Sequence, residues 1–130
     1  MAKILVSDDE RDIRELMGFA LRFAGFDVVL TADGIEALEK VVEEKPDLIL
    51  LDVRMPKITG YDVCRRLKSN PQTRHIPVVF VSAKGLTDEI KHGLDAGAVK
   101  YLVKPIAPDD LIKNVTEVLR GVRLGIYEEA

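Results

Sequence analysis

The stretch Leu48-Ile49-Leu50-Leu51-Asp52 places four consecutive aliphatic residues directly before an aspartate. An apolar run of this length is typical of a strand that is buried on both faces of a parallel sheet. Three other short apolar runs also end at polar residues, namely Ile4-Leu5-Val6 leading to Asp8-Asp9, Val78-Val79-Phe80-Val81 leading to Ser82, and Tyr101-Leu102-Val103 leading to Lys104-Pro105. Because open parallel sheets bind ligands beyond the carboxyl ends of their strands, we expect these polar residues to meet at one edge of a sheet.

Helical patterns separate these runs. Apolar residues recur at three- and four-residue spacing between Ile13 and Ala24, and Glu10 and Asp12 are assigned to the first turn of that helix. The other predicted elements are a strand over Asp27 to Thr31, a helix from Ile35 to Val42, a short helix around Val63 to Leu67, a weak helix near Asp88 to Asp95 that Gly93 interrupts, and a last helix that starts at Pro108. The alternation predicts a doubly wound α/β fold with five parallel strands in the order 2-1-3-4-5 and five helices.

Length and composition narrow the functional classes. The 130-residue chain suits one domain, which we expect at residues 1–120, followed by a tail at 121–130. The formal net charge is −3 and the chain has no long block of Lys and Arg, so direct binding to nucleic acid is not expected. No apolar run approaches the roughly 20 residues that span a bilayer. The single cysteine, Cys64, excludes an internal disulfide, and we expect a cytoplasmic protein that does not contact membranes.

The polar residues at the strand ends predict a particular chemistry. In the order 2-1-3-4-5 the first and third strands are neighbours, so Asp8, Asp9 and Asp52 would lie together. Two carboxylates ~4 Å apart repel by about 4 kcal/mol at an effective dielectric constant near 20. A hard divalent cation relieves this repulsion, and Mg²⁺ suits a site that also holds phosphate oxygens. Asp52 would then be a nucleophile for a phosphoryl group, with Lys104 and Ser82 contacting the phosphoryl oxygens.

Four motifs in register carry a resemblance to a known family. They are the Asp-Asp pair at 8–9, Leu-Leu-Asp-x-x-Met-Pro at 50–56, Val-Ser-Ala at 81–83 and Tyr-Leu-Val-Lys-Pro at 101–105. With these motifs the chain resembles a bacterial two-component response-regulator receiver domain from residue 3 to about residue 120. The resemblance implies a flavodoxin-like fold and a single-domain phosphorylation switch rather than an enzyme, because a receiver promotes only its own phosphotransfer and dephosphorylation.

The resemblance also implies roles at the site. Asp52 would accept the phosphoryl group from a phosphohistidine of a sensor histidine kinase or a phosphotransfer protein. Asp9 would be a direct Mg²⁺ ligand, and Asp8 would act largely through water. Asp52 and the backbone carbonyl of Arg54 would complete the metal ligands supplied by the protein. Lys104 would bind the phosphate, followed by a cis bond to proline.

The same resemblance assigns the switch. Ser82 would be the hydroxyl that engages the phosphoryl group, and Tyr101 the aromatic side chain that then turns inward. The signal would pass to a downstream protein through the face made by the fourth helix, the fifth strand and the fifth helix. Taken alone, Tyr101 could instead pack on the last helix as an ordinary edge-strand aromatic.

The chain departs from the common receiver pattern at several positions. Many receivers have Met-Asp-Gly where this chain has Ile58-Thr59-Gly60. Val99-Lys100 replaces an acidic pair that helps to build the dimer face of receivers fused to winged-helix domains, which argues against that dimer here. Arg54 and Lys84 lie two residues after Asp52 and Ser82, where long side chains would screen the phosphoryl group from water. This predicts a longer-lived phosphorylated form than in chemotaxis-type receivers.

Other functions remain open at this point. A Mg²⁺-dependent phosphohydrolase with an aspartate nucleophile would need a second acid two residues after Asp52, where Arg54 stands. A nucleotide-binding module would need a glycine-rich turn, but the turn after the first strand is Ser7-Asp8-Asp9-Glu10. A pseudo-receiver would lack the phosphoacceptor or the acids, which this chain retains. Taken singly, Asp8 or Asp9 could also be an ordinary helix N-cap.

Overall fold

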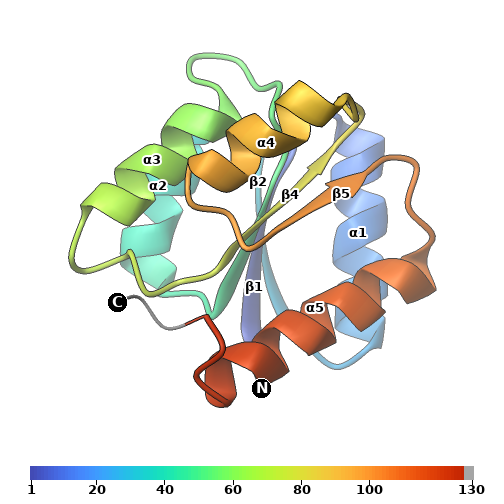
Figure 1. The fold of residues 1–130 in the computed structure, drawn as a ribbon. Helices are drawn as coiled ribbons and strands as arrows, with labels where there is room; N and C mark the ends of the chain where they lie inside the picture. The colour runs from blue at the N-terminus through green and yellow to red at the C-terminus, as the bar shows by residue number, and fades with distance from the viewer. Residues whose placement is uncertain (128–130) are drawn as a thin grey trace.

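Five parallel strands and five helices form the fold, as a computed structural model that describes residues 1–127 shows (Figure 1). The elements are β1 (Lys3–Ser7), α1 (Arg11–Phe23), β2 (Asp27–Thr31), α2 (Gly34–Glu44), β3 (Leu48–Leu51), α3 (Gly60–Ser69), β4 (Val78–Ser82), α4 (Thr87–Asp95), β5 (Lys100–Val103) and α5 (Pro108–Arg123). The sheet order is β2-β1-β3-β4-β5, and every pair of neighbouring strands is parallel. The predicted fold and strand order are therefore confirmed.

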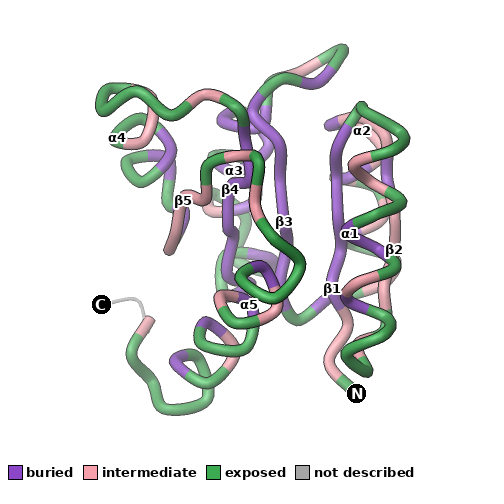
Figure 2. The backbone as a smooth tube through the Cα atoms, turned by 90° about the vertical axis from the view of Figure 1, so that its right-hand side faces the viewer, coloured by how far each residue is buried: buried purple, intermediate pink, exposed green. Residues whose placement is uncertain are grey.

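The alternation of side chains along β3 explains why its sequence is wholly apolar. Ile49 and Leu51 lie in one core cluster, together with residues of α2 and α3, whereas Leu48 and Leu50 lie in a second cluster with residues of α1 and α5. In Figure 2, β1, β3 and β4 are largely coloured as buried, and green marks the outward sides of the helices. A strand covered by helices on both faces has no polar side, so its sequence shows an unbroken apolar run.

The strand register brings the predicted site residues to one edge of the sheet. Ser7 of β1 pairs with Leu51 of β3, so Asp8 and Asp52 both follow paired strand ends. The backbone N–H of Asp52 donates to the carbonyl oxygen of Ser7 over 3.0 Å. At the other side of β4, the N–H of Lys104 donates to the carbonyl oxygen of Ser82 over 2.9 Å. Pairing of the core strands therefore fixes the backbone positions of the polar residues that follow or end them.

Two helix ends differ from the sequence prediction. α1 begins at Arg11, so Glu10 is its N-cap residue and does not lie in the first turn. α5 continues to Arg123, past the predicted boundary at residue 120, and Tyr127 packs against the core cluster that contains α5. Residues 128–130 of the predicted tail lie outside the described residues. The division into a domain at 1–120 and a tail at 121–130 stays a prediction.

The weak helical signal of α4 has a steric origin. A Cβ at Gly93 would lie 2.8 Å from Cδ2 of Tyr101 and 3.0 Å from Cδ2 of Phe80. The helix therefore carries a glycine at the position where two aromatic rings approach its backbone, although glycine lowers its intrinsic stability. Its predicted apolar pair is only partly buried, because Leu94 is 44% exposed. Among the described helices, none has the length and apolar character needed to cross a membrane.

The loop after Asp52 depends on a close approach at Gly60. The N–H of Gly60 donates to the carbonyl oxygen of Val53 over 2.8 Å. A Cβ at this position would clash with the carbonyl oxygen of Asp52 and lie 3.1 Å from Cα of Val53. Because these neighbours are backbone atoms, they cannot turn away as a side chain would. The start of α3 can thus lie against the strand end only if residue 60 has no side chain.

We expect Gly60→Ala to lower the free energy of unfolding by about 1–3 kcal/mol or more, the usual range for overpacking. Gly18→Ala is the matched control, because its Cβ would meet only the Leu30 side chain, at 3.0 Å. In a helix that exchange itself contributes roughly 0.5–1 kcal/mol in favour of alanine. Urea unfolding followed by circular dichroism measures both variants. Equal midpoints for the two would contradict the steric role of Gly60.

Candidate functional site

Lys104 joins two buried carboxylates at the carboxyl edge of the sheet. Its Nζ lies 2.7 Å from Oδ2 of Asp8 and 3.2 Å from Oδ2 of Asp52. The Lys104 side chain is 10% exposed, and those of Asp8 and Asp52 are 0% and 7% exposed. Asp8 follows β1, Asp52 follows β3, and Lys104 reaches across the end of β4 from β5. Four of the five strands therefore end around this contact.

A pocket of about 390 Å³ opens above these groups, and it contains most of the residues that the sequence singled out. Its lining consists of Asp9, Glu10, Asp52, Arg54, Ser82, Ala83, Lys84 and Lys104. Ser82 is buried at the end of β4, and its Oγ accepts a hydrogen bond from the backbone N–H of Lys84 over 3.2 Å. The peptide bond between Lys104 and Pro105 is cis, as the resemblance implied. The strand ends thus converge on one polar pocket.

The carboxylates that come closest together are those of Asp8, Glu10 and Asp52. Each offers one oxygen atom, and these atoms lie within 4.8 Å of one another. Asp9, the predicted direct metal ligand, is exposed and lines the pocket but is not part of this group. Glu10 was not predicted as part of the site, because the sequence pattern assigned it to the first turn of the following helix. Three carboxylate oxygens are suitable donors for a hard divalent cation such as Mg²⁺.

Asp8 is not the N-cap of α1, which is Glu10, but it has a structural role in the turn before that helix. Its Oδ1 accepts a hydrogen bond from the backbone N–H of Glu10 over 2.9 Å, whereas its Oδ2 accepts from Lys104. The first contact stabilises the turn that leads into α1. One carboxylate therefore shapes the loop with one oxygen and holds the lysine with the other.

Burial and charge act in opposite directions on the ionisable groups of the site. Burial, and then the charge of Asp8, raise the pKa of Asp52, and Lys104 offsets only part of this rise. Burial alone would lower the pKa of Lys104, but its hydrogen bond to Asp8 and the charges of Asp52 and Asp8 raise it overall. Lys104 therefore stays protonated at neutral pH, and its charge reduces the cost of burying the carboxylates.

Tyr101 connects the Ser82 loop to α4. Its hydroxyl group donates to the carbonyl oxygen of Lys84 over 2.6 Å, and its ring centroid lies 5.7 Å from that of Phe80. The ring packs against the core cluster on the α3 side of the sheet, so the alternative that it packs on the last helix is wrong. Nζ of Lys84 lies 2.9 Å from Oε2 of Glu89 in α4. The loop after β4 is thus tied to both α4 and β5.

We expect Asp52→Asn to raise the free energy of unfolding near pH 7, because the buried carboxylate is destabilising when ionised. The folded-state pKa of Asp52 is raised, so folding disfavours the charged form at pH values above that pKa. The advantage of Asn should shrink as the pH falls toward 3.8, the ordinary pKa, because the wild-type carboxyl group then becomes protonated. Urea unfolding across this pH range measures the effect, and Glu15→Gln on the exposed face of α1 is the control. If Asp52→Asn were less stable than the wild type at pH 7, the ionised Asp52 carboxylate would not be destabilising, and the prediction would be wrong.

Comparisons with known proteins agree with this geometry. The family model described as response regulator receiver domain matches residues 4–116. Response regulator MprA of Mycobacterium ulcerans is 41% identical over 128 residues, which cover 98% of this chain and 54% of that protein. Its counterpart from Mycobacterium leprae is 42% identical over 121 residues, covering 93% of this chain and 52% of that protein. The chain thus spans about half the length of the curated relatives that it matches.

Solved structures show the same similarity. The chemotaxis response regulator CheY4 of Vibrio cholerae has a TM-score of 0.86 and 34% identity, with 91% of this chain and 98% of that chain covered. A CheY-like receiver domain protein from Methanospirillum hungatei has a TM-score of 0.89 and 26% identity, with 95% and 97% covered. With the family match over most of its length, this chain belongs to the response regulator receiver domain family of two-component signal transduction.

Proposed function

We propose that Asp52 is the phosphoacceptor of this receiver domain and takes its phosphoryl group from a histidine kinase or a phosphotransfer protein. The observation that carries the proposal is the contact of Lys104 with Asp52 and Asp8 at the base of the pocket. An ammonium group within 3.2 Å of the Asp52 carboxylate is well placed to contact a phosphoryl group attached there. The pocket above leaves room for that group.

Mg²⁺ is the proposed cofactor. Asp8, Asp9, Asp52 and the backbone carbonyl of Arg54 would hold it, and the proximity of Glu10 to Asp8 and Asp52 adds a further candidate ligand. When bound, the cation would neutralise charge on the transferring phosphoryl oxygens. Supporting this proposal, the donors are all oxygen atoms, which Mg²⁺ prefers.

The residues of the chain then divide the chemistry between them. An oxygen of the Asp52 carboxylate attacks phosphorus, the bond between phosphorus and the donor nitrogen breaks, and the electron pair of that bond returns to the imidazole. Lys104 keeps its contact with Asp8 and gains a phosphoryl oxygen in place of the carboxylate oxygen of Asp52. The hydroxyl group of Ser82 donates to a second phosphoryl oxygen.

Switching would follow from the contacts of the loop after β4. When Ser82 turns toward the phosphoryl group, its oxygen leaves the N–H of Lys84. The carbonyl oxygen of Lys84 accepts from Tyr101, so displacement of Lys84 is passed to that aromatic ring. Tyr101 in turn lies against α4 at Gly93, so the face formed by α4, β5 and α5 changes for a downstream protein.

The lifetime of the phosphorylated form would depend on Arg54 and Lys84, which both line the pocket. The pairing of Lys84 with Glu89 supports a side chain held at the pocket wall, where it would hinder the approach of water. We therefore expect the phosphorylated form to be long-lived. We also expect the protein to act in the cytoplasm. Direct contact with nucleic acid or membranes is not part of the proposed function of residues 1–120.

The phosphoacceptor assignment predicts a gain of one phosphoryl group when the protein is incubated with acetyl phosphate and Mg²⁺. Intact-mass measurement records the gain, and its decay gives the lifetime. Asp52→Asn and omission of Mg²⁺ should each abolish it. Asp62→Asn, an exposed acid in the first turn of α3, is the matched control and should be phosphorylated like the wild type.

Phosphorylation that persists in the Asp52→Asn variant would contradict the assignment. Continuous turnover of a simple phosphate monoester in excess over protein would instead indicate the alternative, a phosphohydrolase with an aspartate nucleophile. A decay within seconds would contradict the long lifetime expected from Arg54 and Lys84.

Lys104→Ala should still permit some phosphorylation but should uncouple it from the change at Tyr101. The amide resonances of Lys84 and Tyr101 report the switch in two-dimensional NMR, because the Lys84 N–H donates directly to Ser82. In the wild type we expect both resonances to shift on phosphorylation, whereas in the variant they should stay near their starting positions. Lys100→Ala, which removes contacts to Asn114 and Glu117, is the control, because it lies on the strand that leads to Lys104. Wild-type shifts in Lys104→Ala would show that Lys104 does not couple the two events.

A further inference from the structure

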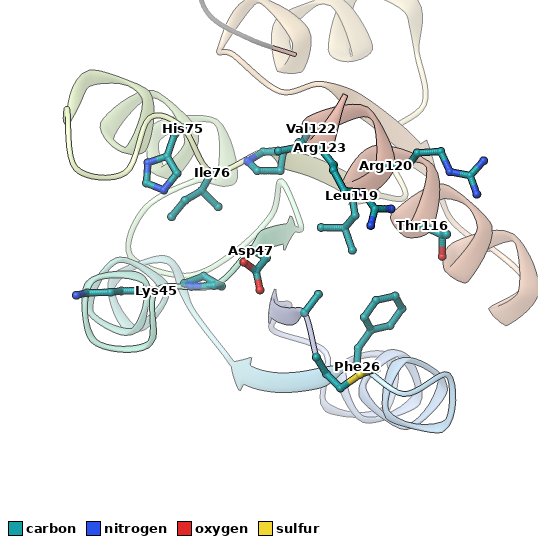
Figure 3. A pocket seen from close by; sticks show the side chains of 14 residues that line it. Phe26, Lys45, Asp47, His75, Ile76, Thr116, Leu119, Arg120, Val122 and Arg123 are labelled. Carbon is teal, nitrogen blue, oxygen red and sulfur yellow. The ribbon is translucent and has the colours of Figure 1, made fainter. Parts of the chain in front are cut away.

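A second cleft lies at the opposite end of the sheet from Asp52, where the strands begin. Its larger part is a pocket of about 670 Å³ between the start of β1, the loop before β4 and the last turns of α5 (Figure 3). A smaller pocket of about 290 Å³ adjoins it, and His75, Pro77 and Val122 line both. The proposed phosphorylation chemistry uses none of these residues.

Basic side chains surround this cleft. Lys45, His75, Arg120 and Arg123 line the larger pocket, and Arg74 lines the smaller one. Figure 3 shows Lys45 and His75 on one side and Arg120 and Arg123 on the other. Among residues 1–127, no ion pair engages the side chains of Arg74, Arg120 or Arg123. In a chain with a net charge of −3, a group of three arginines outside any ion pair sets this end of the described chain apart.

One acid lies among these cations. Asp47 lies between the two basic sides in Figure 3, and its Oδ2 accepts a hydrogen bond from the backbone N–H of Lys3 over 2.8 Å. That contact fixes the carboxylate beside the start of β1. A negatively charged ligand would be attracted by Lys45, Arg120 and Arg123 and repelled by Asp47. Removing a positive charge from the cleft and removing the charge of Asp47 should therefore have opposite effects on its binding.

The floor of the cleft is apolar. Phe26 and Leu119 are partly buried members of the core cluster that contains α5, Ile76 is buried, and Val122 is 40% exposed. A ligand that fits must therefore offer apolar groups as well as negative charge. Exposed acids stand near two lining residues in the sequence, since Asp27 follows Phe26 and Glu43 lies two residues before Lys45. An acidic polypeptide segment can place carboxylates and apolar side chains next to one another, which matches basic side chains around an apolar floor.

We propose that this cleft binds a short acidic polypeptide segment of a partner protein that also carries apolar side chains. Its carboxylates would pair with Arg120, Arg123 and Arg74, and its apolar side chains would cover Phe26 and Leu119. This surface is independent of the proposed phosphoacceptor, because it lies at the other end of every strand. It gives the domain a second contact, separate from the face formed by α4, β5 and α5.

The test is fluorescence anisotropy of a labelled peptide, Glu-Leu-Glu-Phe-Glu-Leu-Glu, titrated with the full chain at low salt. A matched peptide with Gln in place of each Glu is the ligand control. We expect Arg123→Glu to weaken binding of the acidic peptide about tenfold, and Asp47→Asn to strengthen it about twofold or more. Lys113→Glu makes the same charge change on α5 but outside the cleft, and it should change the affinity less than about twofold. Asp52→Asn should bind like the wild type, which separates this proposal from the phosphoacceptor assignment.

Several results would overturn the proposal. The Gln peptide could bind as tightly as the acidic peptide, or the acidic peptide could fail to bind at low salt. Arg123→Glu and Lys113→Glu could lower the affinity for the acidic peptide equally, or Asp47→Asn could lower it. Displacement of the peptide by a short single-stranded oligonucleotide at lower concentration than by unlabelled peptide would mean that the surface prefers nucleic acid. Urea midpoints of the variants confirm that each is folded, and Arg123 and Asp47 are both exposed, so loss of the fold is not expected.

Discussion

The ion contact of Lys104 with Asp8 and Asp52 is the interaction on which the site depends. The two acids follow adjacent strands, and helices cover both faces of these strands, so the carboxylates cannot move apart to relieve their repulsion. Lys104 brings the compensating charge from β5 to within 2.7 Å of one and 3.2 Å of the other. An arrangement held by charge at close range responds to any change of charge at Asp52, as the proposed phosphorylation switch requires.

The fold could be predicted from the sequence because the strongest local signals coincide with the core. Leu48 to Leu51 are buried on both faces, and no turn-forming residue interrupts them. The signals failed at helix ends, where local pattern and tertiary contacts differ. α5 passes residue 120 because Gly121 is buried and Tyr127 packs back against the core, a contact that only the folded chain brings about. α4 looked weak because Gly93 makes room for the rings of Tyr101 and Phe80, which lie on the neighbouring strands β5 and β4.

The site was predictable to the extent that it lies at strand ends. Asp52, Ser82 and Lys104 converge on one pocket as expected. Which of the three consecutive acids after β1 approach Asp52 was not predictable from the sequence. The geometry of the turn decides the direction in which each of these side chains points. Asp8 is buried against Lys104, Asp9 is exposed, and Glu10 approaches Asp52. The alternating side-chain directions of a strand give no guidance once the strand has ended.

A crystal structure of the protein with Mg²⁺ and beryllofluoride tests the central claim most directly, because it locates the phosphoryl mimic and the metal ligands together. We expect beryllofluoride on an oxygen of Asp52, with Lys104 contacting both a fluorine and Asp8, and Mg²⁺ bound by the acids after β1 and by Asp52. The same electron density decides between Asp9 and Glu10 as the direct ligand. Beryllofluoride attached to a residue other than Asp52, or Lys104 turned away from it, would contradict the account.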